Sequence, residues 1–249
     1  MATFNLSSPL AIEQTPDGYR YSIEPFLLVN FANLSTGNRL LDVGTGCGII
    51  PLLASTQLEL GEIVAIEIQK SLYDLAVINM SKNGISGKVS LVHGDFTGST
   101  LSSKDGLFDT AISNPPYRKL NTGRMNPNHE KAVARHEISM NLNSLLTKTS
   151  SLLKYGGSLI MAYPPIRLKE VQETLCSHKL FPSRLRFIHG SREANARIFL
   201  IESVKSQQVE CVIEPPLFIY NKDGSYSKEM EKIYASFNYS SWAHNIQQE

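Results

Sequence analysis

Two short segments of the 249-residue chain contain residue types that can hold a ligand and assist the transfer of a group. Residues 42–48 read DVGTGCG, a carboxylate followed by three alternating glycines. Residues 114–117 read NPPY, which places an amide side chain before two prolines and an aromatic ring. Glycines let the backbone approach a ligand closely because they have no Cβ. The first segment therefore predicts a ligand site, and the second predicts a stiff turn that presents carbonyl oxygens.

The spacing of the glycine segment indicates which ligand it holds. It follows a short apolar run at 39–43 and precedes a helical pattern, and open α/β sheets bind ligands at such carboxyl ends of strands. A dinucleotide fingerprint would need Gly-x-Gly-x-x-Gly, but Ile49 stands where the third glycine would be. The segment instead resembles the first motif of Rossmann-like methyltransferases, whose cofactor is S-adenosylmethionine. In that resemblance Asp42 organises the loop and faces the cationic end of the cofactor.

Two acidic residues after later strands complete the expected cofactor site. Glu67 lies near the end of an apolar run, where a carboxylate can bind both ribose hydroxyls; a surface Glu that caps the next helix is the alternative. By the same resemblance Asp95 takes the adenine amino group, with Phe96 beside the ring, although Gly-Asp also makes an ordinary turn. The expected cofactor contacts are Tyr21, Asp42, Gly44, Thr45, Gly46, Gly48, Glu67, Ile68, Asp95, Phe96 and Asn114. No metal is expected.

The NPPY segment predicts methyl transfer to an amino nitrogen. The lone pair of an exocyclic amine is delocalised into its ring, and two acceptors aimed at the amino protons withdraw it from conjugation. The side-chain carbonyl of Asn114 and the backbone carbonyl of Pro115 can be these acceptors, and Tyr117 offers a face for the target ring. These three residues are the catalytic candidates, and no general base is needed for attack. An Asn-Pro turn with an aromatic residue packed behind it is the structural alternative.

Strand-like and helix-like segments alternate along the chain, which predicts an α/β fold with helices on both faces of a mostly parallel sheet. Strands are expected at 39–43, 63–68, 88–92, 108–113, 158–163, 185–188 and 197–204, and helices at 47–57, 69–82, 137–154 and 167–178. The last two strands are joined too closely for a crossover helix, so the last strand of this seven-stranded sheet should be antiparallel. We expect a Rossmann-like methyltransferase domain at 39–204. An N-terminal extension at 1–38 and a C-terminal tail at 205–249 should pack on it.

Composition places the chain among ordinary globular proteins. Hydrophobic residues make up 42% and charged residues 19%, and no apolar stretch approaches the ~20 residues that a membrane helix needs. The N-terminus has no basic start before an apolar run, and the three cysteines have no paired spacing, so we expect a cytoplasmic protein. The net charge is only +1, but residues 118–135 hold five basic residues against one Glu, and residues 184–197 hold four against one. Such clusters could touch phosphates or could be solvated surface.

The residues around the second segment resemble those of one methyltransferase family. Asn-Pro-Pro-Tyr itself occurs in adenine-N6, guanine-N2 and glutamine-N5 enzymes, so it does not choose the substrate. Stretches within 14–28, 114–137 and 216–226 resemble the bacterial tRNA1(Val) adenine-N6 methyltransferases. This resemblance implies methylation of adenine-37 of a tRNA, next to the anticodon. It also implies a tRNA-facing loop that carries Arg118, Lys119, Arg124 and Arg135, whose alternative role is solvated surface.

Two other functions stay open at this point. A glutamine-N5 methyltransferase of release factors would share the motifs but normally carries a helical substrate domain ahead of the glycine segment, and 41 residues precede Asp42 here. A non-catalytic module that binds S-adenosylmethionine or RNA could keep the fold, but it has no need of paired acceptors at Asn114 and Pro115. We therefore expect an enzyme that acts on tRNA and needs no obligate protein partner or membrane.

Overall fold

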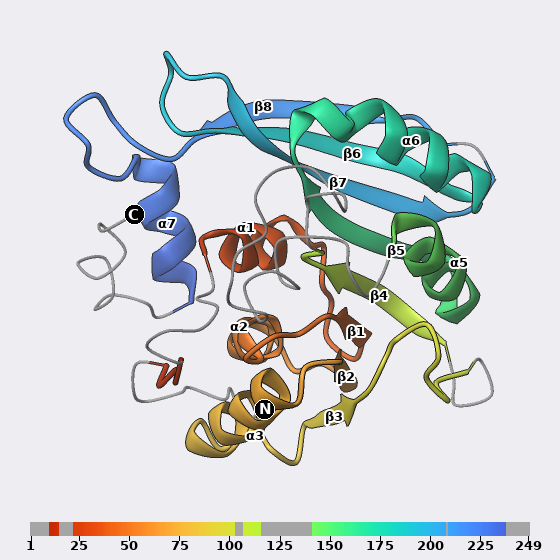
Figure 1. The fold of residues 1–249 in the computed structure, drawn as a ribbon. Helices are drawn as coiled ribbons and strands as arrows, with labels where there is room; N and C mark the ends of the chain where they lie inside the picture. Colours follow the sequence, from red (N-terminus) through yellow and green to blue (C-terminus); the bar gives the residue numbers. More distant parts are fainter. Residues whose placement is uncertain (1–9, 15–21, 103–106, 116–140, 208, 238–249) are drawn as a thin grey trace, which may run out of the picture.

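An eight-stranded sheet with the strand order β3-β2-β1-β4-β5-β7-β6-β8 carries the fold (Figure 1). The computed structural model describes residues 10–14, 22–102, 107–115, 141–207 and 209–237. The strands are β1 Arg39–Val43, β2 Glu62–Glu67, β3 Val89–His93, β4 Phe108–Ser113, β5 Leu153–Tyr163, β6 Leu180–His189, β7 Ala196–Lys205 and β8 Val212–Phe218. β7 runs antiparallel to β5 and β6, and the other pairings are parallel. All strands except β7 therefore end at one side of the sheet, which we call the carboxyl edge.

The strand count differs from the prediction, although the Rossmann-like arrangement and the antiparallel β7 are confirmed. Seven strands were expected, but Val212–Phe218 in the expected tail adds an eighth, β8, parallel to β6. Pro215 and Pro216 obscure this strand in the sequence because a proline cannot donate a ladder hydrogen bond. Proline is tolerated on an edge strand, and β8 lies at the edge of the sheet. β6 is also longer than the expected 185–188.

The junction between α5 and β5 also differs from the prediction. A helix to residue 154 and a strand from 158 were expected, but α5 ends at Leu152 and β5 begins at Leu153. The Gly156-Gly157 pair suggests a helix stop, yet it lies inside the strand. A Cβ on Gly157 would lie 3.0 Å from the Asp109 carbonyl oxygen, so this glycine lets β4 and β5 approach closely. Residues 137–140 of the expected helix lie outside the described residues.

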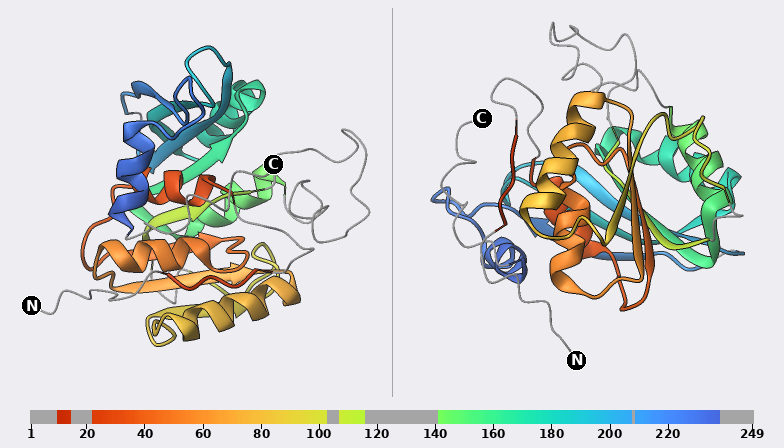
Figure 2. Two further views of the ribbon diagram at one scale, coloured as in Figure 1. Left: turned by 90° about the vertical axis from the view of Figure 1, so that its left-hand side faces the viewer. Right: turned by 90° about the horizontal axis from the view of Figure 1, so that it is seen from below.

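Alternate residues of the central strands supply two hydrophobic cores, one on each face of the sheet. The helices are α1 Glu24–Phe31, α2 Ile49–Gln57, α3 Lys70–Lys82, α5 Leu142–Leu152, α6 Leu168–Ser177 and α7 Lys228–Ser236. Leu40 of β1 packs with α1, α2, α3 and α7, whereas its neighbour Leu41 packs with α5 and α6. This period of two places helices on both faces, as expected (Figure 2). In the described part of the chain, every helix is too short or too polar to span a bilayer.

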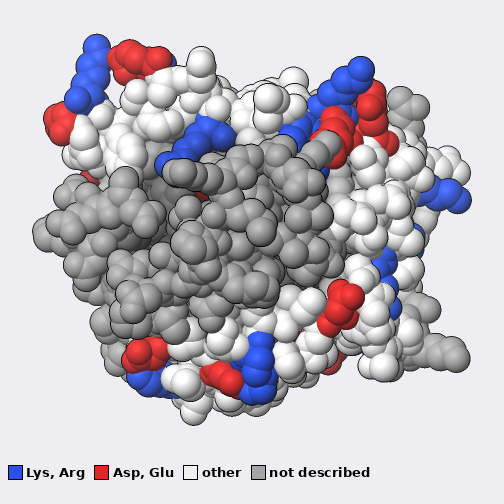
Figure 3. Space-filling model, in the orientation of Figure 1, with Lys and Arg blue, Asp and Glu red and all other residues white. Residues whose placement is uncertain are grey.

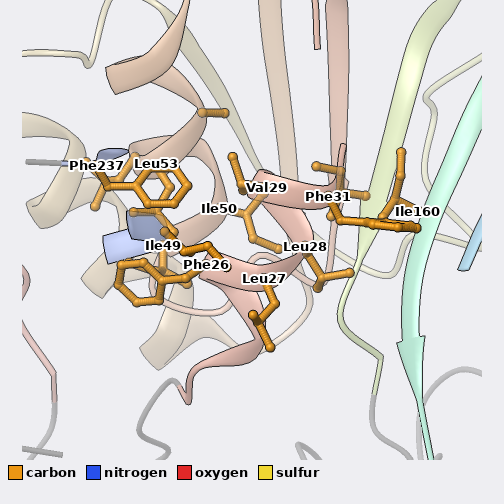
Figure 4. Close-up of a cluster of buried hydrophobic side chains, with 14 of the residues drawn as sticks. Phe26, Leu27, Leu28, Val29, Phe31, Ile49, Ile50, Leu53, Ile160 and Phe237 are labelled. Atoms are coloured by element: carbon orange, nitrogen blue, oxygen red, sulfur yellow. The ribbon is translucent and has the colours of Figure 1, made fainter. Parts of the chain in front are cut away.

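Helix α1 lies inside the first of these cores (Figure 4). All its residues except Asn30 are buried. The Phe26 ring packs edge to face against Tyr234 and Phe237, with centroid distances of 5.1 and 5.7 Å. Segments from the two ends of the chain thus pack on each other as well as on the sheet. The division of the chain at residues 38 and 204 stays a prediction.

Candidate cofactor and acceptor site

The loop after β1 folds back onto the end of β2. The backbone N–H groups of Gly44 and Thr45 both donate to the Ile66 carbonyl at 3.0 Å. The Gly48 N–H donates to the Thr45 carbonyl at 3.0 Å, and α2 begins at the next residue. The loop is therefore fixed at the carboxyl edge where the strand order reverses between β1 and β4. Ligands of open α/β sheets bind at this topological position.

The three glycines of the loop have two different structural roles. Gly44 and Gly46 have φ values of +73° and +58°, which favour glycine, and a Cβ built on either would meet no heavy atom within 4 Å. The space beside them is open to a ligand. Gly48, with φ +84°, lies against α3, because a Cβ there would be 2.6 Å from Met80 Cε and 3.3 Å from Ala76 Cβ. The first two glycines thus leave room for a ligand, and the third allows helix α2 to pack on α3.

Glu67 connects the end of β2 to the glycine loop. Its Oε2 accepts a hydrogen bond from the Gly46 N–H at 2.9 Å, and its Oε1 accepts one from the Gln69 N–H at 2.8 Å. The residue is only 5% exposed. Burial raises the pKa of this carboxyl, while the hydrogen bonds from Gln69 and Gly46 act to lower it. Glu67 is therefore not the surface residue of the alternative interpretation, although it does accept from the Gln69 N–H just before α3. Its role in binding ribose stays a prediction.

Asp42 is a fully buried acid beneath the loop. Neither of its carboxylate oxygens, nor the hydroxyl of Thr45, has a hydrogen-bond partner within the described residues. Burial raises the pKa of Asp42 to about 7; the nearby Thr45 hydroxyl lowers it and the charge of Glu67 raises it. A buried, uncompensated carboxylate is costly unless it meets a cation or hydrogen-bond donors. Asp42 therefore suits a ligand that carries a positive charge.

The remaining cofactor candidates lie at the ends of β2 and β3. Asp95 accepts hydrogen bonds from the backbone N–H and the hydroxyl of Thr97, both at 3.0 Å, which is the geometry of an ordinary turn. Phe96 is 4% exposed and packs in the core that contains α5 and α6. The Ile68 side chain is 40% exposed beside them. Ile68 thus offers an exposed apolar surface at the end of β2, the strand that pairs with the one leading to Asp95, whereas Phe96 is buried in the core.

Asn114 follows β4 directly beside the glycine loop. Ser113 is the register partner of Val43, so Asn114 and Gly44 leave the sheet from neighbouring strands. The buried Ser113 hydroxyl donates to the Val43 carbonyl at 2.9 Å and ties the two strand ends together. Asn114 is half-buried and Pro115 is buried. Sequence reasoning missed Ser113, and its position before the NPPY segment is the only signal in the sequence.

Six of the residues named from the sequence lie outside the described residues. They are Tyr21, Tyr117, Arg118, Lys119, Arg124 and Arg135. The other candidates, from Asp42 to Pro115, come together at the carboxyl edge of β1, β2, β3 and β4. Their chemistry fits S-adenosylmethionine. Asp42 suits its cationic end, and Glu67 suits ribose hydroxyls. The open space beside Gly44 lets a ligand approach the backbone closely.

Comparison with known proteins extends this assignment. A model of the methyltransferase domain family matches residues 34–246. A relative named tRNA1(Val) (adenine(37)-N6)-methyltransferase from Porphyromonas gingivalis is 30% identical over 70% of each chain. A relative with the same name from a Flavobacteriaceae bacterium is 24% identical over 91% of this chain and 94% of its own.

Solved structures agree on the fold. A protein from Agrobacterium tumefaciens, described as a predicted O-methyltransferase, superposes with a TM-score of 0.65 at 16% identity. The match covers 86% of this chain and 96% of that one. With the glycine loop, the strand order and the two named relatives in agreement, the chain belongs to the methyltransferase domain family and, within it, to the tRNA1(Val) (adenine(37)-N6)-methyltransferases.

Proposed function

We propose that this chain is an enzyme that transfers a methyl group from S-adenosylmethionine to the exocyclic N6 amine of adenine-37 in tRNA1(Val). The observation that carries the proposal is the pairing of Val43 with Ser113, which puts the acceptor turn at Asn114 next to the glycine loop. The names of the curated relatives support tRNA as the substrate. Because tRNA is modified in the cytoplasm, we place the enzyme there.

The glycine loop and the two buried acids bind and orient the cofactor. S-adenosylmethionine supplies an electrophilic methyl group on a positively charged sulfur. Asp42 would hold the cationic end of the ligand, and Glu67, which now accepts from the Gly46 and Gln69 N–H groups, would also bind ribose hydroxyls. Asp95 and Ile68, at the ends of β3 and β2, would hold the adenine. These residues would orient the cofactor toward the acceptor turn.

The acceptor turn prepares the adenine amine for attack. The Asn114 side-chain carbonyl and the Pro115 backbone carbonyl would each accept a hydrogen bond from the amino group and so localise the nitrogen lone pair. Positioning of nitrogen, carbon and sulfur in line can supply ~7–11 kcal/mol of the barrier reduction. The electrostatic contribution of Asn114 adds to this. The proton is lost after transfer from a positively charged nitrogen, so no strong base is required.

The substrate base must leave its stack to reach this turn. Enzymes that modify a base in folded nucleic acid extrude the nucleotide into the active site. Tyr117 is our candidate for stacking on the extruded base, worth ~1–3 kcal/mol. Arg118, Lys119, Arg124 and Arg135 remain the proposed contacts to the tRNA backbone.

Incubation with labelled S-adenosylmethionine tests the proposal against the release-factor alternative. The purified chain receives bulk tRNA in one reaction and a release factor in the other. Label in the RNA alone supports the proposal. Label in the release factor alone would contradict it, and label in neither would favour a non-catalytic module.

A further inference from the structure

A pocket of about 550 Å³ lies between the β6–β7 turn and the segment that joins β8 to α7. Small-molecule sites have volumes of this order. Two backbone hydrogen bonds hold the walls together, from the Ile219 N–H to the His189 carbonyl and from the Tyr220 N–H to the Gly190 carbonyl, at 2.9 and 2.8 Å. The two segments meet at the upper left of Figure 1. The walls of the pocket are therefore joined just beyond the ends of β6 and β8.

This pocket opens on the same edge of the sheet as the acceptor turn. β6 and β8 run in the direction of β4 and β5, so His189 and Phe218 end at the carboxyl edge. β6 lies three strands from β4, and β8 lies four strands away. Ser113 is level with Leu185, and His189 lies four residues further along β6. With about 4.8 Å between strands and about 3.4 Å per residue, the pocket is roughly 20–24 Å from Asn114. One RNA substrate can therefore reach both places on a single face.

The structure separates three of the four basic residues of 184–197 into two groups. Arg184 and Arg186 are structural, because they bind Glu202, Glu214 and Glu229 at 2.6 to 2.8 Å. Arg192, on the turn, is different. It is exposed, and no ion pair joins it to a carboxylate in the part of the chain that the structure describes.

Cationic and aromatic groups line the pocket together. The Arg192 guanidinium lies over the Phe218 ring, 5.0 Å from its centroid. Lys228 is exposed at the start of α7 and, like Arg192, makes no ion pair with a described residue. Lys222 faces Glu193 at 3.7 Å, but the two side chains are 85% and 60% exposed, so that pair is weak. Basic and acidic side chains stand side by side at this corner of the surface (Figure 3), and Arg186 engages one of the acids, Glu229.

We propose that this pocket binds a phosphate-bearing nucleotide of the tRNA, separate from the nucleotide whose base enters the acceptor turn. In this proposal the cationic groups of Arg192 and Lys228 bind the phosphate. The outer face of the Arg192 plane, already stacked on Phe218, is available to a base, which is a recurrent way of holding unpaired RNA. The inference rests on the proposed function, since it assigns a second contact with the same substrate. It gives a role to Arg192 and Lys228, which meet no carboxylate among the described residues, whereas Arg184 and Arg186 within β6 are paired.

The test measures the salt dependence of tRNA binding by the full chain. Each phosphate contact contributes about 0.7–0.9 to the slope of log affinity against log salt. The double variant Arg192→Gln, Lys228→Gln removes the contact with this one phosphate and should therefore lower that slope by about 0.7–0.9. At saturating tRNA its kcat should equal that of the wild type, while KM for tRNA rises. Its affinity for S-adenosylhomocysteine, measured by calorimetry, should not change.

Two further variants sharpen the result. Lys179→Gln removes an exposed charge from the turn before β6, at the opposite edge of the sheet, and should leave slope and KM at wild-type values. Arg192→Lys keeps the charge and should keep the slope. If the wild type binds and methylates tRNA but the double variant keeps the full slope and KM, the pocket inference is wrong and the proposed function stands. If the wild type neither binds nor methylates tRNA, both are wrong.

Discussion

The Ser113 hydroxyl donates a hydrogen bond to the Val43 carbonyl at 2.9 Å, in a part of the sheet that solvent does not reach. Val43 ends β1 and Ser113 ends β4, so this bond joins the last residues before the glycine loop and the acceptor turn. The cofactor half and the acceptor half of the site are thus held in one register by a buried side-chain hydrogen bond between their strands.

Ser113→Ala should lower kcat more than cofactor affinity, because the turn at Asn114 loses its anchor while the loop keeps its bonds to Ile66. The lost buried hydrogen bond should cost about 1 kcal/mol of unfolding free energy. Denaturant unfolding and steady-state kinetics measure the two effects. Ser150→Ala is the matched control, since that hydroxyl also donates to a carbonyl at 2.9 Å, on His178, away from the site. An equal loss of kcat in both variants would show that Ser113 has no positioning role.

Glu67→Gln should weaken the binding of S-adenosylhomocysteine. The variant keeps the size of the side chain but removes the charge, and its amide cannot accept from both Gly46 and Gln69 while binding a ribose. Hydrogen bonds to charged groups are worth about 1.5–3 kcal/mol, which corresponds to a loss of tenfold or more in affinity. Calorimetry measures this. Glu62→Gln, at the other end of β2, should bind normally, and normal binding by Glu67→Gln would remove the ribose assignment.

Asp42→Asn should stabilise the ligand-free protein at neutral and higher pH. The Asp42 pKa is about 7 in the folded protein, against about 3.9 for an unfolded chain, so the folded state binds the extra proton. Stability is therefore lost as pH rises from about 4 to 7, by up to about 4 kcal/mol. The asparagine variant should flatten this slope in unfolding measurements and also bind the cofactor more weakly. An unchanged pH slope would mean that Asp42 is ionised throughout.

Asp109→Asn is a reference variant, because it should change the stability of the protein in the opposite direction to Asp42→Asn. Although burial acts to raise it, the pKa of Asp109 is lowered by hydrogen bonds from Lys154 and from the Arg39 N–H. This carboxylate therefore stabilises the protein above its unfolded pKa, and the variant should lose stability at neutral pH. A gain in stability in both variants would argue against a specific effect of Asp42.

The cofactor and acceptor segments could be located from the sequence because their signals are local. The glycine segment at 42–48 and the turn at 114–115 each come at the end of a short apolar run. Parallel strands bring the turns that follow them to the same edge of the sheet. The sequence could not reveal that Ser113 bonds to Val43, because that bond depends on the register of two strands 70 residues apart. Glu67 was expected to bind a ribose or to cap the next helix, and the sequence did not reveal that it also holds the glycine loop through the Gly46 N–H.

The secondary-structure elements that the sequence did not predict lie where local sequence signals conflict with tertiary packing. Two prolines argue against a strand at Val212–Phe218, yet the segment pairs with β6 at the edge of the sheet, where proline is tolerated. Gly156 and Gly157 suggest the end of a helix, but both lie inside β5, where Gly157 allows close approach to β4. The apolar run of α1 carries no information about its partners, which include Tyr234 and Phe237 from the far end of the chain.

Asn114→Ala should reduce methyl transfer by about 100- to 1000-fold, the usual cost of removing one preorganised electrostatic contact from an active site. Cofactor affinity should change far less, because the contacts of Asp42 and Glu67 remain. Single-turnover transfer and calorimetry separate the two quantities. Transfer at the wild-type rate would place the amine site elsewhere in the protein.

Mass spectrometry of nucleosides from tRNA1(Val) treated with the enzyme and S-adenosylmethionine tests the central claim most directly. Fragment mapping then locates the modified position. We predict N6-methyladenosine at position 37 after treatment with the wild type, and far less after treatment with Asn114→Ala. Methylation of a guanine, of a different adenine or of no tRNA nucleoside by the wild type would contradict the account.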